Sequence, residues 1–201
     1  GVDLFFILSG FLIGVILLET RASPRYFRAF YFRRVHRILP IYFLWITLFA
    51  LASFVAAWMF GGADAAMWEP PMPIPFYYLF LQNLVIVPYA GIAFYWLSIT
   101  WSLAVEEQFY LVAPPLVRFL SLRRLAIVLS ATVIAIPFVR WAIILYWPSG
   151  GDVAYLALPC RADSLALGVL SALAWRTESV RSWLASHRRE LRIGLLALSV
   201  G

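Results

Sequence analysis

The stretch VDLFFILSGFLIGVILL, residues 2–18, carries a single charged side chain, Asp3, among apolar and small residues. Its length is close to the roughly 20 residues that an α-helix needs to cross the hydrocarbon core of a bilayer. Ser9 and Gly10 in its middle predict close packing, because small residues allow two helix backbones to approach each other. The stretch therefore predicts a membrane helix that packs tightly on a neighbour.

The rest of the chain continues this pattern. The 201 residues are 64% hydrophobic with a mean hydropathy of +0.87, whereas soluble globular chains are about 45–50% apolar. Long apolar blocks alternate with arginine-rich connectors, which is typical of a polytopic membrane protein. We expect an all-α transmembrane helix bundle with about five to six membrane segments. The candidate spans are 2–18, 38–60, 101–120, 125–145 and 160–175, and a last block begins near residue 193.

The distribution of arginine predicts which side of the membrane each loop faces. Basic residues, all of them arginines, gather in connectors 19–37, 118–124 and 176–192, whereas loops 61–75 and 146–159 contain neither Lys nor Arg. Positive connectors usually remain in the cytoplasm, so we place the three connectors inside and the two loops outside. The positive-inside rule accounts for the net charge of +6, so nucleic-acid binding is not needed to explain it. We expect no nucleic-acid partner.

One segment does not fit a simple series of crossings. The chain must cross an odd number of times between the first outer loop and the connector at 118–124. Full crossings by both 76–88 and 101–120 would give an even number. Residues 76–88 are few, contain two amide side chains and end in proline. We therefore predict a re-entrant or interfacial segment over 76–100, since irregular backbone at membrane depth must be buried in protein or line a cavity.

Cysteine and histidine are scarce. Cys160 is the single cysteine, so an intrachain disulfide is impossible. The two histidines, His36 and His187, lie in arginine-rich connectors and form no cluster with cysteine. We therefore expect no metal site.

Polar residues inside the spans indicate where a functional site lies, because ionisable groups there are costly and usually face a cavity, a partner or a substrate path. On the predicted topology these polar residues fall into two groups at different depths in the membrane. Those near the outer side are Asp3, Ser102, Glu106, Arg161 and Asp163, and those where the second span enters from the cytoplasm are Arg33, Arg34 and Arg37. We expect an outer polar cluster and an inner basic cluster.

Glu106 lies in WSLAVEEQFYL, residues 101–111. Ser102 and Glu106 are four residues apart and share a helix face, whereas Glu107 points about 100° away. Two interpretations of Glu106 remain open. It pairs with an arginine such as Arg161 and holds helices together, or it is a buried functional carboxylate with a shifted pKa. We expect Glu107 to be a residue at the water boundary.

The arginine cluster RRVHR, residues 33–37, also allows two interpretations. It is a topology signal that anchors the chain to anionic lipid head groups, or it is a ligand site. Arg34 and Arg37 are three residues apart and share a helix face. Two guanidinium groups on one face suit a phosphate-bearing ligand, which they can bind in a bidentate manner.

Four stretches, taken together in this order and spacing, resemble the integral-membrane acyltransferase-3 family. That family includes bacterial O-antigen and other polysaccharide O-acetylases, and enzymes that modify peptidoglycan. The resemblance covers nearly the whole chain, and its first and third stretches are the most specific. The stretches are GVDLFFILSGFLI (1–13), YFRRVHRILPIYFLW (31–45), WSLAVEEQFYLVAPPL (101–116) and CRADSLALGVLSALA (160–174).

The resemblance implies a donor and its binding residues. The Arg-x-x-Arg motif of the family matches Arg34 and Arg37, with Arg33 beside them, and these would bind the phosphates of acyl-coenzyme A. The donor, most often acetyl-coenzyme A, is a substrate, and no permanently bound cofactor is implied.

The resemblance also implies catalytic positions. The Ser-x-x-x-Glu motif matches Ser102 and Glu106, and the acidic residue before the Phe-Phe pair matches Asp3. Arg161 and Asp163 match a stretch that we assign to the substrate pathway. The implied activity is a membrane-bound O-acyltransferase of the bacterial inner membrane, which moves an acyl group to a hydroxyl of a cell-surface or lipid-linked carbohydrate. A different class, a transporter or flippase with an intramembrane carboxylate pathway, remains as the alternative.

The resemblance has one departure. Family members carry a preceding span whose histidine is taken as the catalytic base, and neither His36 nor His187 matches it. The sequence starts without Met and ends inside an apolar block. We therefore expect a single acyltransferase domain over 1–201 that is truncated at both ends and is inactive by itself.

Overall fold

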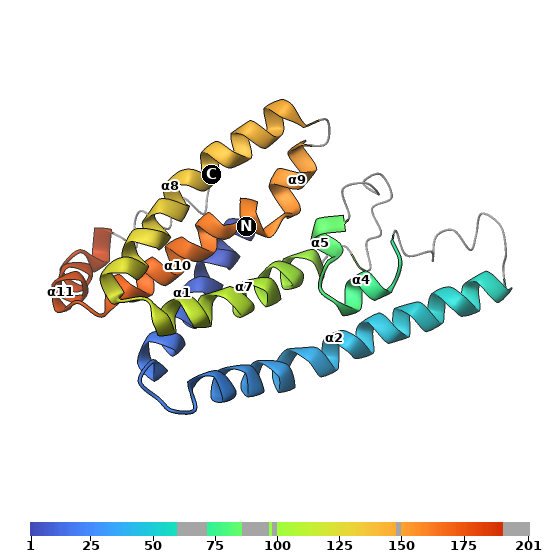
Figure 1. The fold of residues 1–201 in the computed structure, drawn as a ribbon, viewed down its shortest axis with the longest axis horizontal. Coiled ribbons are helices and arrows are strands. Elements are labelled where there is room, and N and C mark those ends of the chain that lie inside the picture. Colours follow the sequence, from blue (N-terminus) through green and yellow to red (C-terminus); the bar gives the residue numbers. More distant parts are fainter. Residues whose placement is uncertain (60–71, 86–96, 98–99, 148–149, 191–201) are drawn as a thin grey trace.

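The computed structural model describes residues 1–59, 72–85, 97, 100–147 and 150–190. Within these residues all regular structure is helical, and no strand occurs. The prediction of an all-α membrane helix bundle is confirmed (Figure 1). The elements are α1 (Val2–Thr20), α2 (Tyr26–Met59), α4 (Pro75–Tyr78), α5 (Gln82–Val85), α7 (Thr100–Phe119), α8 (Leu122–Tyr146), α9 (Gly150–Leu156), the 3₁₀ helix η2 (Leu158–Cys160), α10 (Ala162–Trp175) and α11 (Glu178–Ser186).

Three of the described helices, α1, α2 and α8, are long and apolar enough to span a membrane. α2 and α8 leave large apolar side chains uncovered, for example Ile41 at 73% and Phe138 at 67% exposure. Such surfaces favour lipid over water. α7 has 20 residues, but its two glutamates and Gln108 reduce its hydropathy, and α10 has only 14 residues. The predicted block from residue 193 lies outside the described residues.

α1 and α10 pack against each other over most of their lengths. The contact is a close approach of two backbones at glycines. A methyl group at Gly168 would collide with the carbonyl oxygen of Ile7, and one at Gly10 would collide with that of Leu165. At Gly14 it would lie 2.9 Å from the Cβ of Ala172. The close packing predicted at Gly10 is confirmed, and the partner is α10.

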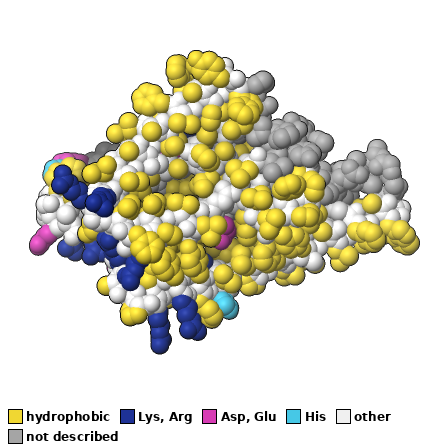
Figure 2. Space-filling view, viewed as in Figure 1, with side chains coloured by type: hydrophobic (Ala, Val, Ile, Leu, Met, Phe, Trp, Pro, Cys, Tyr) yellow, Lys and Arg dark blue, Asp and Glu magenta, His cyan; other side chains and the backbone are white. Residues whose placement is uncertain are grey.

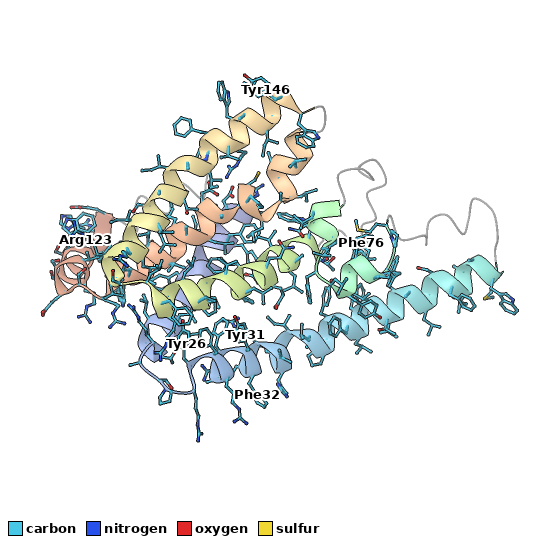
Figure 3. The ribbon with its side chains drawn as sticks, viewed as in Figure 1. Tyr26, Tyr31, Phe32, Phe76, Arg123 and Tyr146 are labelled. Carbon is cyan, nitrogen blue, oxygen red and sulfur yellow. The ribbon has the colours of Figure 1, made fainter. Side chains whose placement is uncertain are left out.

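The main core surrounds this helix pair. It contains buried side chains of α1, α10, α7, α8 and the first turns of α2. From α2, the rings of Tyr26 and Tyr31 extend toward α7, whereas Phe32 points to the opposite side (Figure 3). The Tyr26 hydroxyl donates to the Pro114 carbonyl at 3.0 Å, and the Tyr31 hydroxyl donates to the Tyr110 carbonyl at 3.1 Å. These bonds fix the start of α2 on α7.

α2 begins earlier than the charge pattern predicts. The boundary of the second span at residue 38 is wrong for the helix, which starts at Tyr26 and continues through Pro40 to Met59. The connector predicted over 19–37 is therefore mostly helical, because no glycine or proline interrupts residues 26–37. At 34 residues, α2 is about 51 Å long, which exceeds a hydrocarbon core of about 30 Å. The turns that carry the arginines account for the extra length of α2 beyond its apolar, membrane-spanning part.

The described part of segment 76–100 consists of short pieces. α4 and α5 have four residues each, and Tyr77 belongs to a second core cluster with side chains of α2, where the Tyr42 hydroxyl donates to the Tyr77 carbonyl at 2.7 Å. Asn83 and Gln108 exchange amide hydrogen bonds of 3.1 and 2.8 Å, which fix α5 to α7. This broken backbone, with the side chains of Gln82 and Asn83 buried, fits a re-entrant segment. Most of residues 86–100 lie outside the described residues, so the re-entrant path stays a prediction.

The three basic connectors lie at one end of the bundle, where the arginines form a blue cluster (Figure 2). Several of these arginines bind the free carbonyls of helix C-termini. Arg176 donates to the Leu18 carbonyl at 3.0 Å, and Arg21 donates to the Leu120 carbonyl. A helix leaves its last carbonyls unpaired, and a cation there also complements the helix dipole. The basic end therefore stabilises the bundle as well as carrying the topology signal.

We predict that Gly168→Ala destabilises the protein by about 1–3 kcal/mol, because its methyl group overlaps the α1 backbone. The matched control is Gly151→Ala in α9, where an added methyl group meets no atom within 4 Å. Thermal unfolding of the purified protein in detergent measures both variants. An unfolding temperature of Gly168→Ala equal to that of the wild type would refute this role of the glycines.

Candidate active site

A pocket among the described residues lies between α1, α2 and α7. Its volume of about 440 Å³ is in the range of small-molecule sites. Apolar side chains of α1 form one wall, and charged side chains of α2 and α7 form the other. The lining residues are Phe5, Ser9, Leu12, Ile13 and Ile16 of α1, Arg34, Arg37 and Ile38 of α2, and Leu103, Glu106 and Tyr110 of α7.

Glu106 is the buried charged group of this pocket, with 6% of its surface exposed. The Tyr110 hydroxyl, one helical turn further along α7, donates to its Oε2 at 3.2 Å. Its Oε1 has no hydrogen-bond partner among the described residues. A buried carboxylate oxygen without a donor is costly, so it marks a position where a ligand or water is expected to bind.

Arg34 completes a short polar chain. Its guanidinium carbon lies 4.8 Å from the centre of the Tyr110 ring, and its Nη1 is 3.5 Å from the Tyr110 hydroxyl. The second distance is at the limit of a hydrogen bond. The chain Arg34–Tyr110–Glu106 connects the arginine motif to the glutamate.

Arg34 and Arg37 line the pocket together, as their spacing predicts. They also line an adjoining pocket of about 310 Å³ with Arg33, Phe30 and Ile16. All three arginines of the predicted cluster therefore border one or both of two pockets that share lining residues. Exposed His36 lies outside both, against the Phe32 ring at 4.0 Å between centroids.

The structure excludes one of the two interpretations of Glu106 and corrects two expectations about α7. Glu106 does not pair with Arg161, because Arg161 binds a different carboxylate. It also does not join an outer polar cluster, since it shares its pocket with Arg34 and Arg37. Glu107 is not a boundary residue, because its Oε1 is buried without a hydrogen-bond partner in the described part of the chain. Ser102 is not among the residues that line the pocket.

Asp3 and Arg161 form an ion pair at the opposite end of α1. Arg161 Nη1 lies 2.7 Å from Asp3 Oδ1, and Ser164 donates to the same oxygen at 3.2 Å. Arg161 is buried, and its guanidinium lies 4.5 Å from the centre of the Tyr155 ring. The sequence predicted that Asp3 and Arg161 lie at a similar depth in the membrane. The structure shows that they contact each other directly and so connect α1 to the start of α10.

Asp163 pairs with Arg140 of α8. Arg140 Nη2 lies 2.7 Å from Asp163 Oδ2 and donates to the Cys160 carbonyl at 2.7 Å. Sequence reasoning gave no partner for Arg140. The two ion pairs connect α1, α10 and α8, and they place the predicted residues Asp3, Arg161 and Asp163 apart from Glu106.

Sequence reasoning missed Tyr110. Its signal is present, because a tyrosine four residues after a glutamate lies on the same helix face. The described residues contain no group of three or more His, Cys, Asp or Glu side chains able to hold a metal ion. The polar groups that line this pocket include one buried carboxylate, a phenol and two guanidinium groups.

The fold and the pocket define an integral membrane protein with a charged cavity inside its helix bundle. The chain belongs to the acyltransferase-3 family, whose family model, described as an acyltransferase domain, matches residues 1–201. The resemblance stated from the motifs is confirmed.

Several curated proteins are similar to the chain. The Bacillus subtilis protein YrhL is 31% identical over 215 residues, which cover 90% of the chain. The peptidoglycan O-acetyltransferase OatA of Listeria monocytogenes is 30% identical over 87% of the chain, and the O-acetyltransferase OatA of Staphylococcus aureus is 27% identical over 87%. The chain spans only 30%, 29% and 30% of these relatives, respectively. No solved structure matches it.

We predict that Asp3→Asn destabilises the protein by about 1 kcal/mol, because buried Arg161 loses a carboxylate partner that is itself 60% exposed and therefore partly screened by solvent. Glu19→Gln is the matched control, since it neutralises an exposed carboxylate at the other end of α1. Thermal unfolding in detergent compares the two variants. Equal unfolding temperatures of the two variants would show that the Asp3–Arg161 ion pair makes no measurable contribution to stability.

Proposed function

We propose that the protein is an O-acyltransferase that moves an acyl group, most often acetyl, from acyl-coenzyme A to a hydroxyl of a cell-surface carbohydrate. The observation that carries this proposal is the pocket in which Arg34 and Arg37 face Glu106. Family membership supports the acyltransferase class, and the names of two relatives support an O-acetyl transfer to peptidoglycan or a related glycan.

The arginines suit the donor. Coenzyme A carries several phosphate groups, which guanidinium groups bind through paired, charge-assisted hydrogen bonds. Arg33, Arg34 and Arg37 lie in the first half of α2, which follows the basic connector after α1, and the positive-inside rule predicts that this end is in the cytoplasm, where coenzyme A is found. The apolar α1 wall then leads the acyl arm into the bundle. In a bacterium the corresponding membrane is the inner membrane.

Glu106 suits the chemical step. The acceptor oxygen forms a bond to the thioester carbonyl carbon, the carbon–sulfur bond breaks, and the thiolate leaves. The acceptor hydroxyl gives up a proton, and a base must receive it. We assign to Glu106 the role of receiving this proton or of orienting the histidine that the family resemblance implies. Its Oε1, which is buried and has no hydrogen-bond partner among the described residues, has the capacity for that contact.

The acceptor fits the opposite end of the bundle. Asp3, Arg161 and Asp163 lie at the end of α1 and α10 that is remote from the basic connectors. Ion pairs there hold α1, α8 and α10 together, and we assign them a positioning role on the acceptor side. Ser102 remains a catalytic candidate by its motif alone.

We predict that Glu106→Gln lowers acetyl transfer by at least about 100-fold, since it removes the proton acceptor or its orienting carboxylate. Arg34→Gln should raise the donor KM by about 10-fold or more, because one charge-assisted hydrogen bond contributes about 1.5–3 kcal/mol. The assay follows radiolabelled acetyl from acetyl-coenzyme A into glycan, in membranes that contain the product of the full-length gene. Arg28→Gln, an exposed arginine of α2 outside both pockets, is the control.

The outcomes separate the proposals. Full transfer by Glu106→Gln at equal expression would refute the role of Glu106 and leave the family assignment intact. No transfer by the wild type with any acyl donor would refute the proposed activity and favour a transporter or flippase.

A further inference from the structure

We propose that α11 is an interfacial helix that binds the anionic surface of the cytoplasmic membrane leaflet. The partner is a lipid surface, whose phosphate head groups arginine side chains bind and whose acyl boundary accepts tryptophan and leucine. α11 (Glu178–Ser186) lies in the third basic connector and outside the candidate active site. The inference therefore does not depend on the proposed activity.

α11 begins at the membrane boundary. α1 is long and apolar enough to span a membrane, and it ends at Thr20. Arg176, the residue after α10, donates to the Leu18 carbonyl in the last turn of α1 at 3.0 Å. The ends of α1 and α10 are therefore level, and α11 starts two residues later. It lies at the end of the bundle that carries the arginine cluster (Figure 1, Figure 2), which the positive-inside rule predicts to be cytoplasmic.

The sequence of α11 is amphipathic. Val180, Trp183 and Leu184 are three and four residues apart, so they form an apolar face on one side of the helix. Ser182 lies on the opposite side, about 160° from Leu184. Arg181 lies at the border of the apolar face, about 60° from Leu184.

The apolar face of α11 belongs to neither described core. An amphipathic helix of a globular protein buries this face, but no residue of α11 is buried and none belongs to the two core clusters of the described residues. Trp183 is 54% exposed, and Trp175 at the end of α10 is 46% exposed. Tryptophan at this depth is typical of the membrane interface, because its ring is apolar and its indole N–H is polar.

The charge of this segment indicates that the lipid is anionic. Residues 176–190 contain four arginines and two glutamates. Neither of the two described ion pairs includes one of these arginines, and Arg181, Arg188 and Arg189 are exposed. The cytoplasmic leaflet carries anionic lipids and attracts basic segments next to a span. Interfacial helices combine such basic residues with an apolar face that enters the acyl boundary.

A short helix is sufficient because it is attached to the bundle. Many interfacial helices have about 20–30 residues, whereas α11 has nine. Its attachment to α10 makes membrane binding intramolecular, which raises the effective concentration of the lipid surface. Binding by α11 would then hold the cytoplasmic end of α10 at the membrane surface.

The test determines what surrounds each side of α11. A nitroxide label is attached at Leu184→Cys on the apolar face and, as the matched control, at Ser182→Cys on the opposite side. The full-length protein, with its other cysteines replaced, is reconstituted in phosphatidylcholine vesicles with or without phosphatidylglycerol. Electron paramagnetic resonance measures collisions with oxygen, which is concentrated in lipid, and with a nickel chelate, which remains in water. In anionic vesicles we expect oxygen to dominate at residue 184 and the chelate to dominate at residue 182.

Substitution of two arginines tests the charge. One arginine near an anionic surface contributes about fivefold to binding, so Arg181→Gln with Arg188→Gln should lower the binding equilibrium of α11 by about 25-fold. The label at residue 184 should then become accessible to the chelate. The matched control, Arg181→Lys with Arg188→Lys, retains the charge and should keep the label in lipid. Both arginines are exposed, so neither double variant removes a core side chain.

The outcomes separate the possible surroundings of α11. Oxygen dominance at residue 184 alone, lost in neutral vesicles and in the glutamine double variant, supports the inference. Access of the chelate to both sides in anionic vesicles shows a helix in water and overturns it. A label at residue 184 that neither reagent reaches shows that protein covers the apolar face, which also overturns it. Oxygen dominance that persists in neutral vesicles or in the glutamine double variant overturns the anionic surface as the partner.

Discussion

The backbone contact between α1 and α10 is the interaction on which the rest of the structure depends. Gly10, Gly14 and Gly168 remove the side chains that would separate the two helices. The stripe that lines the pocket, Phe5 to Ile16, lies on nearly the opposite face of α1. One helix therefore connects the tightest packing of the bundle to the pocket that holds Glu106, and the position of α10 fixes the depth and rotation of the α1 wall.

Charge is divided between two places in this bundle. At the far end, the ion pairs Asp3–Arg161 and Asp163–Arg140 are closed contacts of 2.7 Å. In the pocket, Glu106 instead receives one bond from a phenol and forms no ion pair among the described residues. A paired charge in a membrane protein mainly holds helices together, whereas an unpaired buried one is retained for a ligand. This difference, rather than sequence position, distinguishes the two sets of carboxylates.

Apolar blocks and arginine connectors were sufficient to predict an all-α membrane bundle, its main helices and the glycine contact at Gly10. These patterns did not predict the start of α2. The arginines suggested a connector there, but a stretch without glycine or proline remains helical even when it is rich in arginine. Depth along a helix predicted an outer position for Glu106, but the lateral approach of α2 brings Arg34 to it. Tyr110 was missed because a tyrosine in an apolar helix resembles core packing until its hydroxyl partner is known.

Residues 106–108 of α7 connect the charged pocket to the segment around α5. Glu106 faces the arginine pocket, and Gln108, two positions later, binds Asn83 of α5. On a rigid helix these side chains keep a fixed angular offset. A turn of α7 about its own axis that released the amide pair would also carry the Glu106 carboxylate away from Arg34. Movement of the segment around α5 is thus coupled to the charged pocket through this turn of α7.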